Sequence, residues 1–116
     1  MHAEQRVKSA LEREFKQPFN EERLLAGKKL DGTAAYKKFD AVSSNGKIVA
    51  MVKDYSAGNK QGNQIRHPRV MRDLYYMSLV SADKKLMFLS KQYYEWFVEQ
   101  ADAAIAPGIE LRVLPA

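Results

Sequence analysis

A tight turn near the middle of the chain restricts the fold more than any other feature of the sequence. Asn45 and Gly46 stand in the segment SSNGK, between the runs KKFDAV and IVAMVK, which are both rich in apolar residues. Both residues tolerate a positive φ, so this pair is the strongest short-range signal for a β-hairpin. In a two-residue turn Ser44 pairs with Lys47, and the numbers of all facing residues then add up to 91.

This register predicts which side chains of the hairpin share a face. Asp40 lies directly opposite Met51 and diagonal to Lys53, at Cβ separations of about 5 Å and about 7–8 Å. One face mixes apolar and charged side chains, namely Lys38, Asp40, Val42, Ser44, Lys47, Val49, Met51 and Lys53. The other is a core face, namely Phe39, Ala41, Ile48, Ala50 and Val52, with Lys37 and Asp54 at its open end.

The elements around the hairpin follow from apolar spacing and from proline and glycine. A first helix is expected from about Ala3 to Lys16, and a short helical turn from Glu21 to Ala26, while Lys28–Leu30 fits either a loop or a short strand. The glycine-rich segment 56–64 is typical of a mobile connector. Residues 85–90 and 109–115 read as strands.

Two more helices complete the prediction. One is expected to begin near Pro68 and to end at about Ala82. Its buried stripe would comprise Val70, Met71, Leu74, Tyr75 and Leu79. Another is expected over residues 91–104. The order is α-β-β-α-β-α-β, which implies one α/β domain over residues 1–116, with a mixed central sheet that contains the hairpin and has helices on its faces.

Charge is unevenly distributed along the chain. The net charge is +5, and residues 27–85 hold twelve basic and five acidic side chains. A basic surface attracts polyanions, of which nucleic acid is the commonest. The chain has no cysteine, and we expect neither a signal sequence nor a membrane span, which favours a cytoplasmic protein.

Basic and polar residues after the hairpin are candidates for contacts with nucleic acid. Arg66, Arg69 and Arg72 are spaced by three positions, so on a helix they could contact successive phosphates, or form a solvated edge. Lys60 and Gln64 lie in the preceding segment, and Lys38 lies on the hairpin. The aromatic segment QYYEWF (92–97) favours core packing or a dimer interface over base stacking.

The segment FDAVSSNGKIVAMVK resembles the PD-(D/E)xK, or restriction-endonuclease-like, nuclease superfamily. In that signature an aspartate opens one strand, and an acid, any residue and a lysine follow on the next. The resemblance covers most of the chain from Glu4 to Leu114 and implies a restriction-endonuclease-like core. It assigns Asp40 and Glu4 to a site for Mg²⁺ or Mn²⁺, and it makes Asp40, Lys53 and Glu4 the catalytic residues.

One position departs from this signature. Met51 stands where the second acid is expected, and a thioether is a poor ligand for magnesium. Either Glu4 or Glu14 on the first helix could compensate, since some relatives move this acid to another element. The plain alternative is a surface ion pair of Asp40 with Lys53 or Lys38.

The sequence therefore predicts a nuclease-like, DNA-associated protein with a degenerate metal site and with residual or lost phosphodiester hydrolysis. Two other interpretations stay open. The first is a module that binds nucleic acid, DNA rather than RNA, without catalysis. The second is an interaction domain that forms a homodimer through the aromatic helix.

Overall fold

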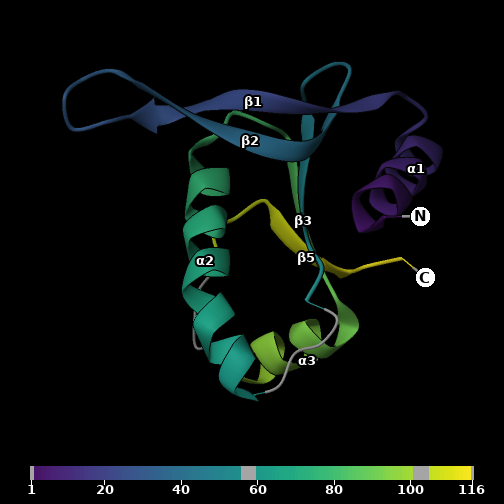
Figure 1. Ribbon diagram of the computed structural model, residues 1–116. Coiled ribbons are helices and arrows are strands. Elements are labelled where there is room, and N and C mark those ends of the chain that lie inside the picture. The colour runs from purple at the N-terminus through teal and green to yellow at the C-terminus, as the bar shows by residue number, and fades with distance from the viewer. Residues whose placement is uncertain (1, 56–59, 101–104, 116) are drawn as a thin grey trace.

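The sheet and helices of the chain were determined in a computed structural model, which describes residues 2–55, 60–100 and 105–115 (Figure 1). The protein is α/β, with a mixed sheet of five strands and three helices. The elements are α1 (Ala3–Phe15), β1 (Phe19–Lys28), β2 (Ala34–Ser43), β3 (Ile48–Lys53), α2 (Lys60–Leu79), β4 (Lys84–Leu89), α3 (Lys91–Gln100) and β5 (Ile109–Val113).

The strands lie in the sheet in the order of the sequence, β1-β2-β3-β4-β5. The first three form an antiparallel meander, whereas β3, β4 and β5 run parallel to one another. Parallel neighbours require a crossover connection, which α2 supplies between β3 and β4 and α3 supplies between β4 and β5. The sheet is therefore mixed, as the sequence predicts.

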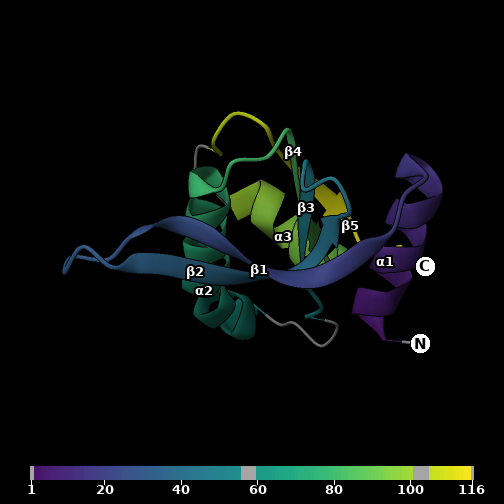
Figure 2. The ribbon, with the colours of Figure 1, turned by 90° about the horizontal axis from the view of Figure 1, so that it is seen from above.

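Helices cover both faces of the sheet (Figure 2). On one face, α2 and α3 enclose a core that includes Val49, Met51 and Met87. On the other face, α1 packs through Ala3, Val7 and Leu11 against the opposite sides of the same strands. Both faces of β3 and β4 are buried, so their short apolar runs fit a central position in the sheet.

The predicted register of the β2–β3 hairpin is confirmed. Ala41 pairs with Ala50, and Val42 pairs with Val49, so the numbers of facing residues add up to 91. The turn itself differs from the prediction. The Gly46 N–H donates to the Ser43 carbonyl at 2.9 Å, and of the two residues Asn45 and Gly46 only Gly46 has a positive φ (74°). The loop comprises the four residues 44–47 instead of the predicted two, and this difference of two leaves the register of the strands unchanged.

The segment after α1 is a strand, so the predicted helical turn over 21–26 is wrong. Residues 19–28 form β1, which pairs with β2 along most of its length. Leu24 and Ala26 face the α2 side while Leu25 points away, a period of two that only a strand provides. The Asp31 carboxylate accepts hydrogen bonds from the N–H and hydroxyl of Thr33, and Gly32 has a φ of 88°. The pair Asp31-Gly32 is a typical hairpin signal, so the sequence did contain a local indication of this turn.

Helix α2 begins at Lys60, eight residues before the predicted start at Pro68. Residues 56–59 of the expected connector lie outside the described residues, and residues 60–64 are helical. Tertiary contacts hold this first part of the helix: Asn63 is buried, and the ring of His67 packs against Trp96 and Phe97. Packing thus outweighs the local preference of the residue before proline for extended geometry.

The buried stripe of α2 was predicted only in part. Val70 and Leu74 are buried as expected, but Tyr75 and Leu79 are exposed. Asp73 occupies the stripe instead, with 1% of its surface accessible. The predicted helix over 91–104 and the two later strands are present as α3, β4 and β5, although residues 101–104 lie outside the described part.

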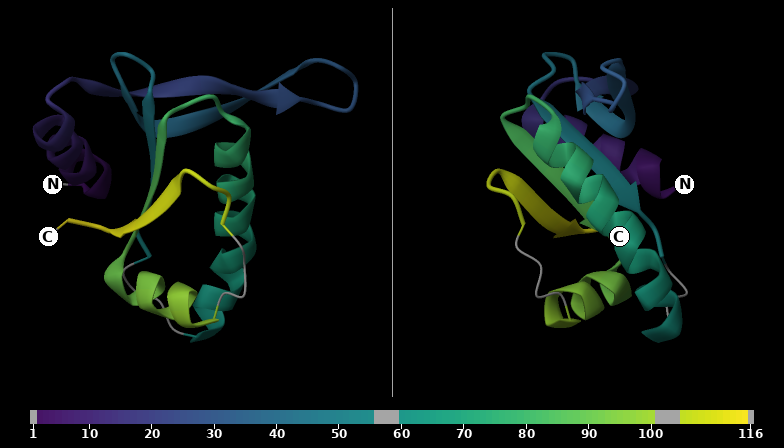
Figure 3. Two further views of the ribbon diagram at one scale, coloured as in Figure 1. Left: turned by 180° about the vertical axis from the view of Figure 1, so that it is seen from behind. Right: turned by 90° about the vertical axis from the view of Figure 1, so that its left-hand side faces the viewer.

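The hairpin of β1 and β2 extends beyond the body of the molecule (Figure 3). After the pair Ala41–Ala50, β2 separates from β3 and continues with β1 alone. Residues 23–38 form this projection, which we call the β1–β2 arm. One side of the arm contacts α2 through Leu24 and Ala26, as far as Gly27 beside Leu79, and the tip extends past the helices.

Candidate functional site

A β-bulge in β2 determines the geometry around Asp40. Asn20 pairs with Val42 and Glu22 pairs with Phe39, so two residues of β2, Asp40 and Ala41, oppose a single residue of β1. An extra residue in one strand reverses the alternation of side chains beyond it. Bulges of this kind often redirect a side chain beside a functional site.

The bulge corrects the predicted hairpin faces. Phe39 belongs to the core on the α2 side, together with Val42 and Met51, whereas Ala41 belongs to the core on the α1 side. Lys37 therefore faces α2, rather than the opposite face to which simple alternation assigns it. Simple alternation failed here because it assumed a regular strand through Asp40.

The Asp40 carboxylate lies where β2 and β3 separate. Its Oδ2 accepts a hydrogen bond of 2.7 Å from the backbone N–H of Val52, a group that lies beyond the last β2–β3 residue pair. Burial raises the pKa of Asp40, and the negative charge of Glu4 adds to this rise. The Val52 N–H and the charges of Lys38 and Lys53 oppose it without cancelling it. Asp40 is thus a half-buried carboxyl group whose pKa lies above its usual value.

Asp73 supplies a second carboxylate to the same place, from α2. Its Oδ1 lies 2.9 Å from the Lys37 ammonium, and its Oδ2 forms an ion pair with the ammonium of Lys53. Burial alone raises the pKa of Asp73, but the two lysines outweigh burial and lower it. The lysine side chains are about a quarter exposed, at 26% and 23%, so the pair of ammonium groups connects a buried acid to solvent.

These residues line a single cavity of about 240 Å³ between the two strands and α2. The two carboxylates and three lysines around it carry a net charge of +1 when all are ionised, because three positive and two negative charges sum to that value. The lining residues, which we call the Asp40 pocket, are Lys37, Lys38, Asp40, Met51, Val52, Lys53 and Asp73.

The predicted catalytic residues come together only in part. Asp40 and Lys53 line the same cavity, and Lys38 lies beside them. Glu4 is exposed on α1 and close enough to Asp40 to influence its pKa, but it does not line the pocket. Glu14 instead pairs with Arg112 of β5 at 2.6 Å, so its carboxylate is engaged elsewhere.

The donor set of the pocket fits Mg²⁺ or Mn²⁺ poorly. These ions prefer oxygen ligands and usually bind through one or two carboxylates with water. Two ammonium groups already neutralise Asp73, and one oxygen of Asp40 accepts the Val52 N–H. Across the described ranges, no group of three or more histidine, aspartate and glutamate side chains is placed to hold a metal ion.

Apart from Lys38 on β2, the residues predicted to contact nucleic acid are spread along α2. Arg69 and Gln64 are exposed, and the Arg72 side chain reaches Asp73 at 3.7 Å. The guanidinium of Arg66 instead lies over the ring of Tyr55, 4.7 Å from its centre. Residues three positions apart on a helix are offset by about 60° around its axis. Arg66 and Arg72 are therefore about 120° apart, so the three arginines do not share one face. The side chain of Lys60 lies outside the described part.

The aromatic residues of α3 pack within the chain. Tyr93 and Phe97 are almost fully buried, with 0% and 1% of their surface accessible. Tyr93 packs edge-on against Tyr55, and Trp96 contacts the rings of His67 and Tyr93. The prediction of core packing is confirmed for these two buried residues, which cannot form a dimer interface.

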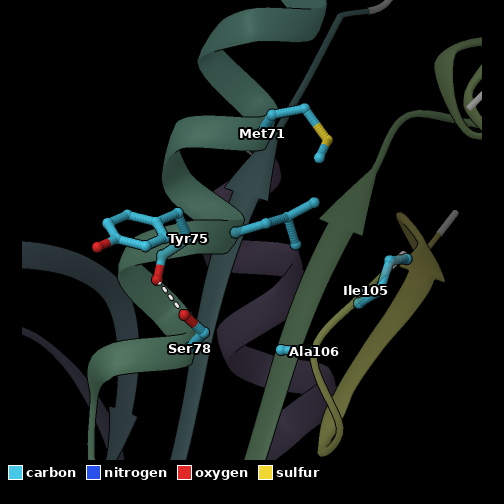
Figure 4. Close-up of a pocket in the computed structure, with 6 residues that line it drawn as sticks. Met71, Tyr75, Ser78, Ile105 and Ala106 are labelled. Atoms are coloured by element: carbon cyan, nitrogen blue, oxygen red, sulfur yellow. Dashed lines mark hydrogen bonds between the residues drawn. The ribbon is translucent and has the colours of Figure 1, made fainter. Parts of the chain in front are cut away.

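A second cavity, of about 220 Å³, lies between α2 and the segment before β5 (Figure 4). Its lining is mostly apolar, and the hydroxyl of Ser78 donates to the carbonyl of Tyr75 within the helix. Figure 4 shows Met71 directed toward the segment that carries Ile105 and Ala106, while the ring of Tyr75 points away. The described side chains that line this cavity include no charged group, so they provide less chemistry than those of the Asp40 pocket.

Sequence reasoning missed Asp73 and Lys37 as pocket residues. A single aspartate between Arg72 and Leu74 gave no motif, but it falls three residues after Val70 and four before Met77. Such spacing places it on the buried stripe of a helix. An acid on a buried stripe requires a charged partner, and this was the available signal for a site.

Comparisons with protein-family models, with curated proteins and with solved structures each gave no match. None of the helices in the described residues has the length and apolar composition to cross a membrane. The functional assignment therefore rests on the chemistry of the Asp40 pocket and its surroundings.

Proposed function

We propose that this chain is a nuclease-like, DNA-associated protein in which the Asp40 pocket holds a phosphate of the nucleic-acid backbone. The observation that carries this proposal is the gathering of Lys37, Lys38 and Lys53 around one cavity whose net charge is positive. Ammonium groups are common ligands of phosphate oxygens, and a net positive charge favours an anion over a cation. We further propose that phosphodiester hydrolysis at this site is reduced or lost.

Kinship with the restriction-endonuclease-like fold is part of this proposal. Asp40 on β2 and Lys53 on β3 line the same cavity, as the resemblance implies for its aspartate and its lysine. One helix precedes the hairpin and another follows it, which agrees with the expected core. The extra strand β1 stands between α1 and the hairpin in the chain, but it pairs at the edge of the sheet, so β2 and β3 remain neighbours.

Loss of hydrolysis follows from the donor set. Met51 provides no oxygen ligand, and Asp73 is held by two lysines. The poor fit for Mg²⁺ or Mn²⁺ argues against a metal-assisted step at this pocket. Lys53, paired with Asp73, would then act as a phosphate ligand rather than as a group that activates water.

Fluorescence anisotropy with a labelled duplex of about 20 base pairs tests the proposal. We expect salt-dependent binding that persists in EDTA, with a slope that reports the number of neutralised phosphates. Lys53→Gln should weaken binding by about fivefold or more, since one charged contact is lost, whereas the exposed Lys91→Gln should change it by less than about twofold. Circular dichroism of each variant controls for folding. Absence of binding at low salt in the wild-type protein would reject the proposal.

Metal titration separates a live nuclease from a degenerate one. We expect no saturable Mn²⁺ binding by calorimetry in the wild-type protein at millimolar metal. Saturable binding that disappears in Asp40→Ala would instead establish a working metal site and contradict the proposed loss of activity. Cleavage of supercoiled DNA in Mg²⁺ or Mn²⁺ provides a second measurement with the same pair of proteins.

Homodimer formation, the remaining prediction, has its own measurement. Sedimentation velocity at several concentrations distinguishes a monomer from a dimer. A stable dimer without any DNA affinity would favour an interaction domain over the nucleic-acid function.

A further inference from the structure

We propose that the β1–β2 arm enters the major groove of duplex DNA and holds the duplex against the Asp40 pocket. This inference rests on the proposed function and adds to it the partner class and the element that contacts it. Three features of the arm carry the argument: its shape, its charge and its continuity with the pocket.

The shape of the arm fits a DNA groove. From the pair Glu22–Phe39 to the pair Lys28–Ala34, β1 and β2 pair only with each other. About six residues per strand at roughly 3.3 Å each give a ribbon about 20 Å long. The major groove of B-form DNA is about 12 Å wide and admits a two-stranded β-ribbon.

The charge of the arm suits a polyanion. Between residues 23 and 38 the sequence has five basic side chains and one acidic one, a net charge of +4 over this segment. The single acid, Asp31, is occupied by hydrogen bonds to Thr33 within the tip. Lys28 and Lys29 at the tip are exposed, so they are available to phosphates on either side of a groove.

One face of the arm is uncovered. Arg23 pairs with Lys38 across the two strands, and Leu25 pairs with Tyr36, and all four side chains are exposed. Leu25 and Tyr36 have 55% and 56% of their surface accessible. Two cations beside an aromatic and an aliphatic side chain can contact phosphates and the apolar edge of thymine in the same groove.

The arm and the pocket form one continuous surface. Lys37 and Lys38 are the last residues of the arm and also line the Asp40 pocket. Their side chains point to opposite sides of β2, toward Asp73 in one case and toward Glu21 in the other. A duplex that receives the arm in its groove would thus place backbone phosphates beside the pocket.

Duplex RNA should bind less well than duplex DNA. The major groove of A-form RNA is deep and too narrow for side chains to enter. The proposed geometry therefore predicts a preference for duplex DNA over duplex RNA of the same sequence, of about tenfold or more at matched salt.

The decisive experiment compares two double variants with equal charge change in the anisotropy assay. Lys28→Gln/Lys29→Gln removes two charges from the tip and leaves its backbone hydrogen bonds in place, from Lys29 N–H to the Thr33 carbonyl and from Gly32 N–H to the Lys29 carbonyl. Arg13→Gln/Lys91→Gln removes two exposed charges from α1 and α3. We expect the tip variant to lose about tenfold in affinity and about 2 in salt slope, and the control to lose less than about threefold.

The outcomes separate this inference from the proposed function. If the tip variant binds duplex DNA like the control while Lys53→Gln does not, the pocket assignment stands and the arm inference is rejected. Equal affinity for duplex DNA and duplex RNA also overturns it. Self-association of the wild-type protein that is lost in Leu25→Ser would assign the arm to a second copy of the chain instead. Absence of DNA binding in the wild-type protein rejects both proposals.

Discussion

The two walls of the Asp40 pocket bury a carboxyl group in opposite ways. On the β2 wall, burial and one backbone N–H leave Asp40 with a raised pKa. On the α2 wall, Asp73 is more deeply buried, and yet two ammonium groups lower its pKa. Burial therefore does not decide the charge of an acid by itself, because the cations within reach decide it.

The same contrast supports the proposed loss of metal binding. In a metal site a divalent ion, rather than lysine, is the partner of the buried carboxylates. Both Asp40 and Asp73 would then need free carboxylate oxygens. Here the α2 wall is already neutralised by Lys37 and Lys53. Two lysines therefore hold the position beside Asp73 that a divalent ion would need.

Removal of the α2 carboxylate should have the largest effect on stability. In Asp73→Asn the ammonium groups of Lys37 and Lys53 lose their buried partner, which costs about 2–4 kcal/mol after allowance for their partial access to water. Urea denaturation at pH 7 measures the free energy of unfolding. The exposed Asp83→Asn is the matched control and should stay within about 0.5 kcal/mol of wild type.

The same variant has a defined pH dependence. The folded pKa of Asp73 is lowered, so its contribution is present above the unfolded pKa of about 3.9 and is lost as the pH falls through the folded value. The difference between Asp73→Asn and wild type should therefore shrink in acid. A difference that stays constant down to pH 3 would contradict the ion-pair explanation.

A second acid in the pocket, at Met51 on β3, should favour metal binding. Met51 is 2% exposed, so Met51→Glu should cost about 2 kcal/mol in EDTA, because it buries a carboxylate. Mn²⁺ should then stabilise the variant by about 2.7 kcal/mol at a hundred times its dissociation constant. Thermal melts with and without metal measure this shift. Met51→Gln, similar in size but uncharged, should show no response to metal, and a folded Met51→Glu without a response would count against the nuclease alignment.

Adjacent lysines of β2 provide a sharper comparison. Lys37 pairs with the buried Asp73, whereas Lys38 pairs at 3.3 Å with Glu21, and both side chains of that second pair are more than half exposed. Lys37→Gln should cost about 1 kcal/mol and Lys38→Gln less than about 0.5 kcal/mol, because water screens the exposed pair. If urea denaturation gave equal losses in the free energy of unfolding for the two variants, Lys37 and Lys38 would not occupy the different environments described.

Loss of the Asp40 carboxylate should change stability only slightly, and in a pH-dependent way. The folded pKa of Asp40 is raised, so its contribution to stability is present below the unfolded pKa of about 3.9 and is lost as the pH rises through the folded value. Asp40→Asn cannot ionise and keeps an oxygen for the Val52 N–H. Its stability should match wild type within about 1 kcal/mol at pH 4 and improve relative to wild type toward pH 7. Denaturation at pH 4, 5, 6 and 7 measures this trend, which a lowered pKa would reverse.

The sequence predicted the elements whose patterns are local. Apolar spacing predicted helix α1 and the buried strand β4, and the position of the turn predicted the pairing of Ala41 with Ala50. The missed strand β1 and the early start of α2 have a common cause. Pairing with β2 and packing against Trp96 and Phe97 stabilise conformations that the local sequence does not favour.

The sequence by itself determined how Asp40, Met51 and Lys53 are placed relative to one another. The position of the turn sets the register of the hairpin, and the register decides which residues face each other. Only the tertiary structure decided the rest of the pocket. The bulge at Asp40 turned Lys37 toward α2, and the packing of α2 on the sheet brought Asp73 to both lysines. These contacts join Asp73 to residues 36 and 20 positions away, and their charges and burial depend on distances that no local pattern encodes.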